Sequence, residues 1–245
     1  MEGSFDPAFR RLVDQFAASL DEGERGAVAV RIAGRTVVNL RGGRIDPQEA
    51  ALWQADTLAC VFSVTKGVIS LLAHRLIDKG LLSPTATVAS IWPAFAAQGK
   101  AEITVHDVLT HRAGLPAVSG PVVPGDLYDW DRMVDALAAS APVCPASTAP
   151  VYHNMTYGHL LGEILCRATG IRPLSLLLAK EVTLPLAADF KLGLAPADLA
   201  RTARMATTDP AALFDALQSD PAGLERVAPD RIRDSQWCRF VIPCR

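Results

Sequence analysis

A serine and a lysine stand three residues apart at the start of a long apolar segment, in Ser63-Val64-Thr65-Lys66. After Lys66 the apolar side chains recur at the spacing of a mostly buried helix, which Gly80 is expected to end. Residues i and i+3 lie on one face of a helix, one turn apart. A lysine held that close can take the proton of the serine hydroxyl and make the serine a nucleophile. So short a motif also arises by chance, and its weight depends on the residues around it.

The rest of the chain predicts an α+β fold in which a β-hairpin is followed by a region of helices. A segment over 6–20 has apolar residues at helical spacing. Two alternating, β-branched segments, 26–32 and 35–40, flank Ala33-Gly34, which favours a hairpin with a glycine turn. Beyond the helix that follows Lys66, further helices are expected over 104–111, 131–141, 155–169 and 173–181.

The second chemical element is Tyr152-His153-Asn154, which precedes the apolar helical segment 155–169. A tyrosine whose pKa is lowered by a nearby lysine ammonium can act as a general base. The amide of Asn154 could bind a substrate carbonyl or the lysine. Taken alone, Tyr152 could equally be a core aromatic residue with a satisfied hydroxyl, and Asn154 a helix N-cap.

Composition and charge argue against several classes of function. Half of the 245 residues are apolar, as in an ordinary globular protein, and the formal net charge of −2 indicates neither a nucleic acid nor an anionic membrane as partner. No apolar run approaches the ~20 residues that span a bilayer. No export signal is visible, so we expect a cytoplasmic protein. The five cysteines form no Cys-x-x-Cys pair, and no His-Glu-x-x-His run occurs, which argues against a zinc site.

Two motifs and their flanks resemble a known family. Val61-Phe62-Ser63-Val64-Thr65-Lys66-Gly67 resembles the nucleophile motif of the serine β-lactamase and penicillin-binding superfamily. Tyr152-His153-Asn154, followed by Tyr157-Gly158-His159-Leu160-Leu161-Gly162, is similar to the second motif of its class C-like branch, which includes many esterases. Further matching stretches are Asp56-Thr57-Leu58, Leu109-Thr110-His111-Arg112-Ala113-Gly114-Leu115 and Pro185-Leu186. The resemblance covers roughly residues 25 to 200 in the family's order.

The resemblance implies a β-lactamase/transpeptidase-like fold and an acyl-enzyme mechanism that needs no metal or organic cofactor. Ser63 would attack an ester or lactam carbonyl, while Lys66 and Tyr152 would carry the proton to the leaving group. Asn154 would position the substrate or the lysine. The backbone N–H of Ser63, at a helix N-terminus, would donate one hydrogen bond to the oxyanion.

Two more residues are expected to contact a small-molecule ester or lactam substrate. His153 lies between Tyr152 and Asn154. Trp130 ends the Pro-, Gly- and Val-rich stretch 115–130, which predicts a long loop, and such loops in compact domains are often functional. The sequence gives no indication of an oligomeric state.

The family's third motif, a Lys-Thr-Gly, His-x-Gly or Trp-Gly-Gly-like pattern, does not occur in the sequence up to Arg245. We therefore expect a single domain over 1–245 that is truncated at its C-terminus, with an antiparallel sheet that is incomplete. Its expected parts are a helix and hairpin over 1–62, a mainly helical region over 63–225 and an irregular tail over 226–245.

Several functional hypotheses remain open at this point. The first is a serine hydrolase, a carboxylesterase of small or medium esters, and the second is a truncated relative without catalytic competence. A β-lactamase or D-alanyl peptidase is a further alternative, which the missing export signal disfavours. A Ser-His-Asp hydrolase would usually show a Gly-x-Ser-x-Gly elbow, and none occurs.

Overall fold

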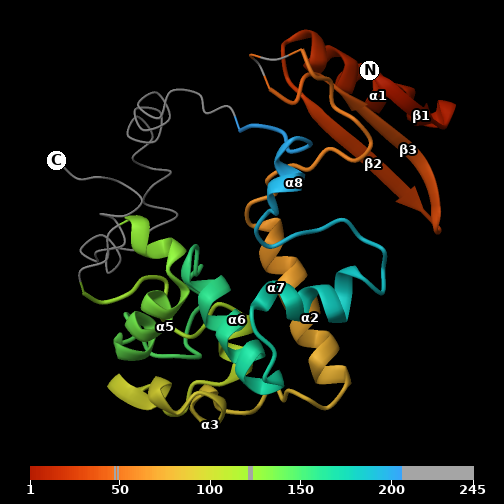
Figure 1. Cartoon of the computed structure of the whole chain (residues 1–245). Coiled ribbons are helices and arrows are strands. Elements are labelled where there is room, and N and C mark those ends of the chain that lie inside the picture. Colours follow the sequence, from red (N-terminus) through yellow and green to blue (C-terminus); the bar gives the residue numbers. More distant parts are fainter. Residues whose placement is uncertain (47, 49, 121–123, 206–245) are drawn as a thin grey trace. The chain divides into compact units, whose positions relative to one another are not determined.

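The computed structural model describes residues 1–205, apart from 47, 49 and 121–123 (Figure 1). Over these residues the chain is α+β, as expected, and it divides into two compact units. One unit is Met1–Val61 with the segment that begins at Leu194, and the other starts at Phe62 and continues to Gly193. The expected tail over 226–245 and the helical region beyond 205 lie outside the described residues. That the whole chain forms one domain stays a prediction.

The first unit is a three-stranded antiparallel sheet with a helix packed against it. Strands β1 (Glu2–Phe5), β2 (Gly26–Ile32) and β3 (Arg35–Gly42) lie in the order β1-β3-β2. Helix α1 (Arg10–Asp21) follows a 3-10 turn, η1 (Pro7–Phe9). The buried core of the unit consists of Val13 from α1 and Val38 and Leu40 from β3.

The predicted hairpin is confirmed, and its turn has a clear physical basis. Ala33 and Gly34 both have positive φ angles, +49° and +76°, as the two central residues of a type I′ turn require. Strand β1, which the pattern does not predict, pairs with the other edge of β3. A Cβ at Gly3 would lie 1.9 Å from the Asn39 carbonyl oxygen, so glycine allows this close approach. The third strand and α1 support a hairpin that would be marginal alone.

The segment after Leu194 packs back onto the connector that follows the hairpin, which the sequence pattern does not predict. It contains the short helix α8 (Pro196–Leu199). The Leu58 N–H donates to the Arg201 carbonyl (2.9 Å), and the Ala203 N–H donates to the Leu58 carbonyl (2.7 Å). The Arg204 guanidinium also forms an ion pair with Asp46 at 2.9 Å. These contacts connect two stretches that are far apart in the sequence.

The second unit is helical. Its helices are α2 (Val64–Asp78), α3 (Val88–Ile91), α4 (Val105–Leu109), α5 (Trp130–Ala139), α6 (Thr156–Thr169) and α7 (Leu174–Leu178). Tighter or wider turns form η2 (Pro93–Gly99), η3 (Pro124–Tyr128) and η4 (Ala179–Thr183). The predicted helices are confirmed, although α7 is shorter than expected and passes into the π-type turn η4. In the part of the chain described, no helix is both long and apolar enough to cross a membrane.

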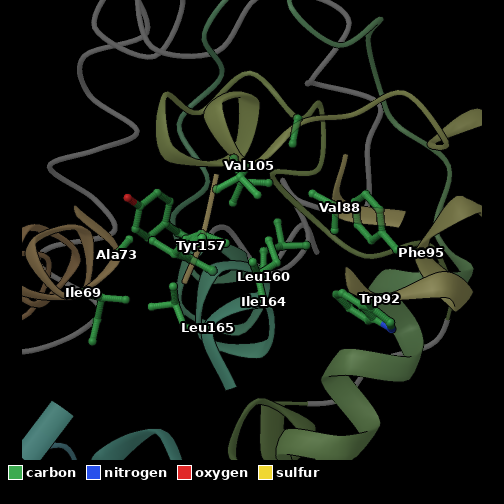
Figure 2. Packing of buried hydrophobic residues seen from close by; sticks show 14 of the residues in the cluster. Ile69, Ala73, Val88, Trp92, Phe95, Val105, Tyr157, Leu160, Ile164 and Leu165 are labelled. Carbon is green, nitrogen blue, oxygen red and sulfur yellow. The ribbon is translucent and has the colours of Figure 1, made fainter. Parts of the chain in front are cut away.

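Helix α6 is the centre of the core of the second unit. Its side chains Leu160, Leu161, Ile164 and Leu165 are fully buried. Figure 2 shows the labelled members of the cluster that surround them, from α2, α3, η2 and α4. Burial of a leucine or isoleucine side chain contributes about 2 kcal/mol. This packing holds the first turns of α2 and α6, and both motifs found in the sequence lie at or just before those turns.

Candidate active site

Ser63 is the N-cap residue of α2, and it is exposed. Its hydroxyl makes no capping hydrogen bond to the helix. Phe62, just before it, has a left-handed φ of +44°, which is uncommon for a bulky residue. The helix N-terminus carries a partial positive charge, which favours negative charge developing beside Ser63. The hydroxyl is therefore available for chemistry at an electrostatically suitable position.

Lys66 lies one helical turn after Ser63, as the spacing predicts. Its Nζ donates a hydrogen bond to Ser63 Oγ over 3.1 Å. The backbone N–H of Lys66 also donates to the Ser63 carbonyl at 3.1 Å, so the first turn is closed. The lysine is half-buried, and its ammonium group directly faces the hydroxyl.

Tyr152 completes a three-residue cluster with these two side chains. Hydrogen bonding with Ser63 lowers the pKa of Tyr152; partial burial opposes this, and hydrogen bonding with Lys66 and the Lys66 charge lower it further. Lys66 Nζ also lies 4.9 Å from the centroid of the Tyr152 ring. Tyr152 is 50% exposed, so it is not the core aromatic residue of the alternative interpretation. The cluster can pass a proton among three side chains.

Asn154 is half-buried, two residues after Tyr152 and just before α6. The N-cap position of α6 is occupied by Met155, so Asn154 does not fill the capping role considered from the sequence. Its side chain therefore remains a candidate for binding substrate or Lys66.

The structure corrects the expectation that His153 binds substrate. The side chain is completely buried, and both ring nitrogens bond to the backbone. Nδ1 lies 2.6 Å from the Val151 carbonyl, so it carries the proton, and Nε2 accepts from the Leu115 N–H at 3.0 Å. The pKa of His153 is lowered to about 4. Burial is the main cause, the hydrogen bond to Val151 opposes it by raising the pKa, and nearby His111 lowers the pKa. His153 is thus a neutral structural residue beneath the site.

Replacing His153 with glutamine is expected to make folding less sensitive to acid. Because the pKa is about 4 in the folded state and 6.5 ordinarily, the unfolded state binds the extra proton between these values. Stability is therefore lost as the pH falls from 6.5 towards 4, by about 3 kcal/mol in total. Glutamine can still accept from the Leu115 N–H but does not titrate.

The measurement is the free energy of unfolding, from denaturant titrations between neutral pH and about pH 4. His74→Gln, which replaces an exposed histidine on α2, is the matched control and should keep the wild-type pH dependence. An equally steep loss of stability towards acid pH in His153→Gln would contradict the assignment of His153 as a buried, neutral residue.

Trp130, the other residue expected to contact substrate, begins α5 and has a structural contact as well. Its indole N–H donates to Glu163 Oε2 over 3.0 Å. Glu163 is buried and also pairs with Arg167 and Arg172. Burial alone would raise the pKa of Glu163, but hydrogen bonds from Arg172, Trp130 and Arg167 hold it below its usual value. Trp130 is thus fixed to Glu163 of α6, which two arginines hold in place.

Trp130 also lines a cavity of about 610 Å³ in the second unit. Thr65, from the first turn of α2, and Met155, directly after Asn154, line it too. Most of the other lining residues are apolar; the lining also includes Ile69, Gly158, Pro173, Leu174 and Leu192. The cavity thus adjoins both motifs in the chain and offers a largely apolar surface.

His111, which the sequence places in a matching stretch and in a turn that ends a helix, packs against Tyr152 of the site. It follows α4 with a left-handed φ of +61°. Its ring lies 4.8 Å from the Tyr152 ring and 4.6 Å from the Tyr157 ring, measured between centroids. Burial lowers the pKa of His111, and the nearby Lys66 charge lowers it further. Its place in the matching stretch 109–115 singles it out in the sequence, but nothing in that stretch indicates that His111 lies close to Tyr152.

Within the described ranges, no group of three or more histidine, cysteine or acidic side chains is arranged to hold a metal ion. The chemistry that the cluster can perform is proton transfer and nucleophilic attack by Ser63.

Comparison with known proteins decides the family. The beta-lactamase family model matches residues 9–230. The chain belongs to the beta-lactamase family. It is 40% identical over 200 residues to "Esterase/beta-lactamase LipL" of Mycobacterium tuberculosis (strain ATCC 25618 / H37Rv), covering 80% of this chain and 46% of that protein.

Solved structures of beta-lactamase family relatives share the fold. The crystal structure of a family VIII carboxylesterase superposes with a TM-score of 0.79 at 35% identity, covering 96% of this chain and 64% of that one. A penicillin-binding protein homolog from Caulobacter crescentus also superposes with a TM-score of 0.79, at 37% identity, covering 85% of this chain and 56% of that one. The expected β-lactamase/transpeptidase-like fold is thus confirmed, with a small antiparallel sheet and many helices. The chain spans about half the length of the curated relatives it matches.

Proposed function

We propose that this protein is a serine hydrolase that forms an acyl-enzyme at Ser63 and acts on carboxylic esters. The observation that carries the proposal is the 3.1 Å hydrogen bond from Lys66 Nζ to Ser63 Oγ, beside a tyrosine, Tyr152, whose pKa Ser63 and Lys66 lower. A nucleophile needs a base within hydrogen-bonding distance and a partner that orients the base. Ser63, Lys66 and Tyr152 meet both requirements.

The reaction would proceed in two halves. Ser63 Oγ attacks the ester carbonyl while its proton passes to the Tyr152 phenolate, which the Lys66 ammonium stabilises, and the Ser63 backbone N–H stabilises the oxyanion at the start of α2. The proton then moves to the departing alkoxide, which leaves Ser63 acylated. A water molecule then attacks the acyl carbonyl and gives a proton to the same base, which passes it to Ser63 Oγ as the carboxylic acid departs. Asn154 would hold the carbonyl group of the substrate or orient Lys66.

Esters of small or medium length are the favoured substrates. The names of two relatives, LipL and the Burkholderia gladioli protein "Esterase EstB", describe esterases. The cavity of about 610 Å³ is lined mainly by apolar side chains, which suits an acyl chain better than a charged peptide. β-Lactams are the second candidate class, because the name of LipL also includes beta-lactamase.

The decisive experiment is intact-mass analysis after treatment with a fluorophosphonate probe, followed by peptide mapping. We expect one adduct, on the peptide that contains Ser63. Assays with p-nitrophenyl esters and with a chromogenic cephalosporin then separate the two substrate classes. Absence of an adduct on the folded protein, together with absence of turnover, would overturn the proposal and favour a relative that is not catalytically competent.

Replacing Gly158 with leucine is expected to reduce hydrolysis of long acyl esters selectively. A Cβ at this position would meet no atom within 4 Å, and Gly158 lines the cavity, so a leucine side chain would occupy that space. Losing room for a few methylene groups should lower kcat/KM for p-nitrophenyl octanoate about 10-fold or more relative to the acetate. Gly158 is a cleaner choice than Trp130, which also bonds to Glu163.

The control is Gly158→Ala, which adds one methyl group and should change the octanoate-to-acetate ratio by less than about twofold. An unchanged ratio in Gly158→Leu would show that the cavity does not accept the acyl chain.

A further inference from the structure

We propose that His111 is a positioning residue that holds Tyr152 against Ser63 and Lys66. The catalytic meaning of this placement rests on the proposed function, whereas the placement itself is a property of the fold. The proposal is carried by hydrogen bonds between two segments that are about forty residues apart in the sequence, the turn after α4 and the segment before α6.

His111 is bonded to the chain on both sides of Tyr152. Its carbonyl oxygen accepts from the Val151 N–H at 2.8 Å, and its ring Nδ1 accepts from the His153 N–H at 3.0 Å. One residue therefore fixes the peptide groups that bracket Val151 and Tyr152. The backbone from which the Tyr152 side chain extends cannot shift without breaking one of these bonds.

The ring of His111 packs against the ring that it positions. Its centroid is 4.8 Å from that of Tyr152 and 4.6 Å from that of Tyr157, which is buried on α6. The His111 ring thus lies between the exposed tyrosine of the site and a tyrosine fixed in the core. This contact limits the rotation of the Tyr152 side chain as well as the position of its backbone.

The hydrogen bonds also determine the protonation state of His111. Nδ1 accepts a bond, so the neutral ring must carry its proton on Nε2. Burial and the nearby Lys66 charge both lower the pKa of His111, which keeps the ring neutral. A protonated ring would lose its acceptor and place a second cation beside Lys66.

A second pair of bonds strengthens the same connection further along both segments. The Leu115 N–H donates to His153 Nε2 at 3.0 Å, and Thr156 Oγ1 donates to the Leu115 carbonyl at 2.6 Å. The turn from His111 to Leu115 therefore holds the segment from Val151 to Thr156 by hydrogen bonds at several points. The left-handed φ of +61° at His111 is the kind of strained backbone that persists where surrounding contacts enforce it.

The test compares three substitutions at this position. His111→Asn keeps an acceptor close to the place of Nδ1 and tolerates a left-handed backbone. His111→Leu has a similar volume but no acceptor, and His111→Gly suits the backbone but has no acceptor either. If the low pKa of Tyr152 and kcat are retained in His111→Asn and lost in the leucine and glycine variants, the effect is assigned to the hydrogen-bond acceptor.

The first readout is the ionisation of Tyr152, which does not depend on turnover. The chain has three tyrosines, so ultraviolet titration of tyrosinate in each His111 variant, minus the same variant carrying Tyr152→Phe, isolates Tyr152. We expect the pKa to move up towards its ordinary value of 10.0 in the leucine and glycine variants and to stay low in the asparagine variant. An unchanged pKa in all three would overturn the proposal.

The second readout is catalysis, with Thr156→Val as the matched control because it removes another bond of the same connection without touching Tyr152 directly. We expect kcat to fall about 10²-fold in the leucine and glycine variants at nearly constant KM, and to stay within about 5-fold of wild type in the asparagine variant. An equal loss of kcat in Thr156→Val at matched melting temperature would indicate a merely structural role. If the wild type itself lacks Ser63-dependent turnover, the proposed function fails, and the tyrosine titration still decides the placement.

Discussion

Replacement of Ser63 with alanine is expected to lower kcat/KM for ester hydrolysis by about 10⁴- to 10⁶-fold and to abolish fluorophosphonate labelling. The reason is that Lys66 and Tyr152 converge on the Ser63 hydroxyl, and no other described nucleophile occupies that position. Stability should change little, because Ser63 is exposed and its side chain does not cap α2. The measurement pairs steady-state kinetics with intact mass after probe treatment.

Ser70→Ala is the matched control for this experiment. Ser70 lies two helical turns further along α2, and its hydroxyl interacts with His74 and Tyr157 rather than with Ser63. We expect turnover and labelling to stay within about twofold of wild type in this variant. Substantial hydrolysis by Ser63→Ala would exclude Ser63 as the nucleophile.

Replacement of Lys66 with methionine is expected to lower kcat by about 10³-fold and to slow fluorophosphonate labelling to a similar extent. The variant keeps most of the side-chain volume but removes the group that bonds to Ser63 Oγ over 3.1 Å. It also removes the Lys66 charge and hydrogen bond that help lower the pKa of Tyr152, so the proposed proton acceptor is impaired as well. Lys66→Arg should be nearly as inactive, because the larger, planar guanidinium cannot take the place of the compact ammonium beside Ser63 Oγ and Tyr152.

Lys79→Met is the matched control for Lys66. Lys79 follows the last turn of α2 and pairs with Glu181, so its loss should reduce stability without affecting labelling. Melting temperatures of both variants separate the two effects. Wild-type labelling rates in Lys66→Met would show that another group activates Ser63.

Local sequence patterns predicted much of this fold and the central part of the site. The hairpin and the long helices were predictable, because each depends on residues a few positions apart. Ser63 and Lys66 were predictable as a pair for the same reason, since one turn of α2 determines their separation. Tyr152 was associated with them only through the family resemblance, and the fold brings it into the same cluster.

Other features depend on contacts between distant segments, for which no local pattern exists. The pairing of β1 with β3, and the return of the chain after Leu194, bring together stretches that neither periodicity nor turn residues connect. The same limit explains the error at His153, whose place in the sequence between two candidate site residues says nothing about burial.

The sequence by itself therefore determined the α+β class, the main helices and the serine–lysine pair, because these follow from spacing along the chain. Only the tertiary structure decided which histidine faces the site, that His111 brackets Tyr152, and that an apolar cavity lies beside both motifs. The physical reason is that hydrogen bonds such as that from the His153 N–H to His111, and cavities between helices, form only when the core around α6 has brought remote segments together.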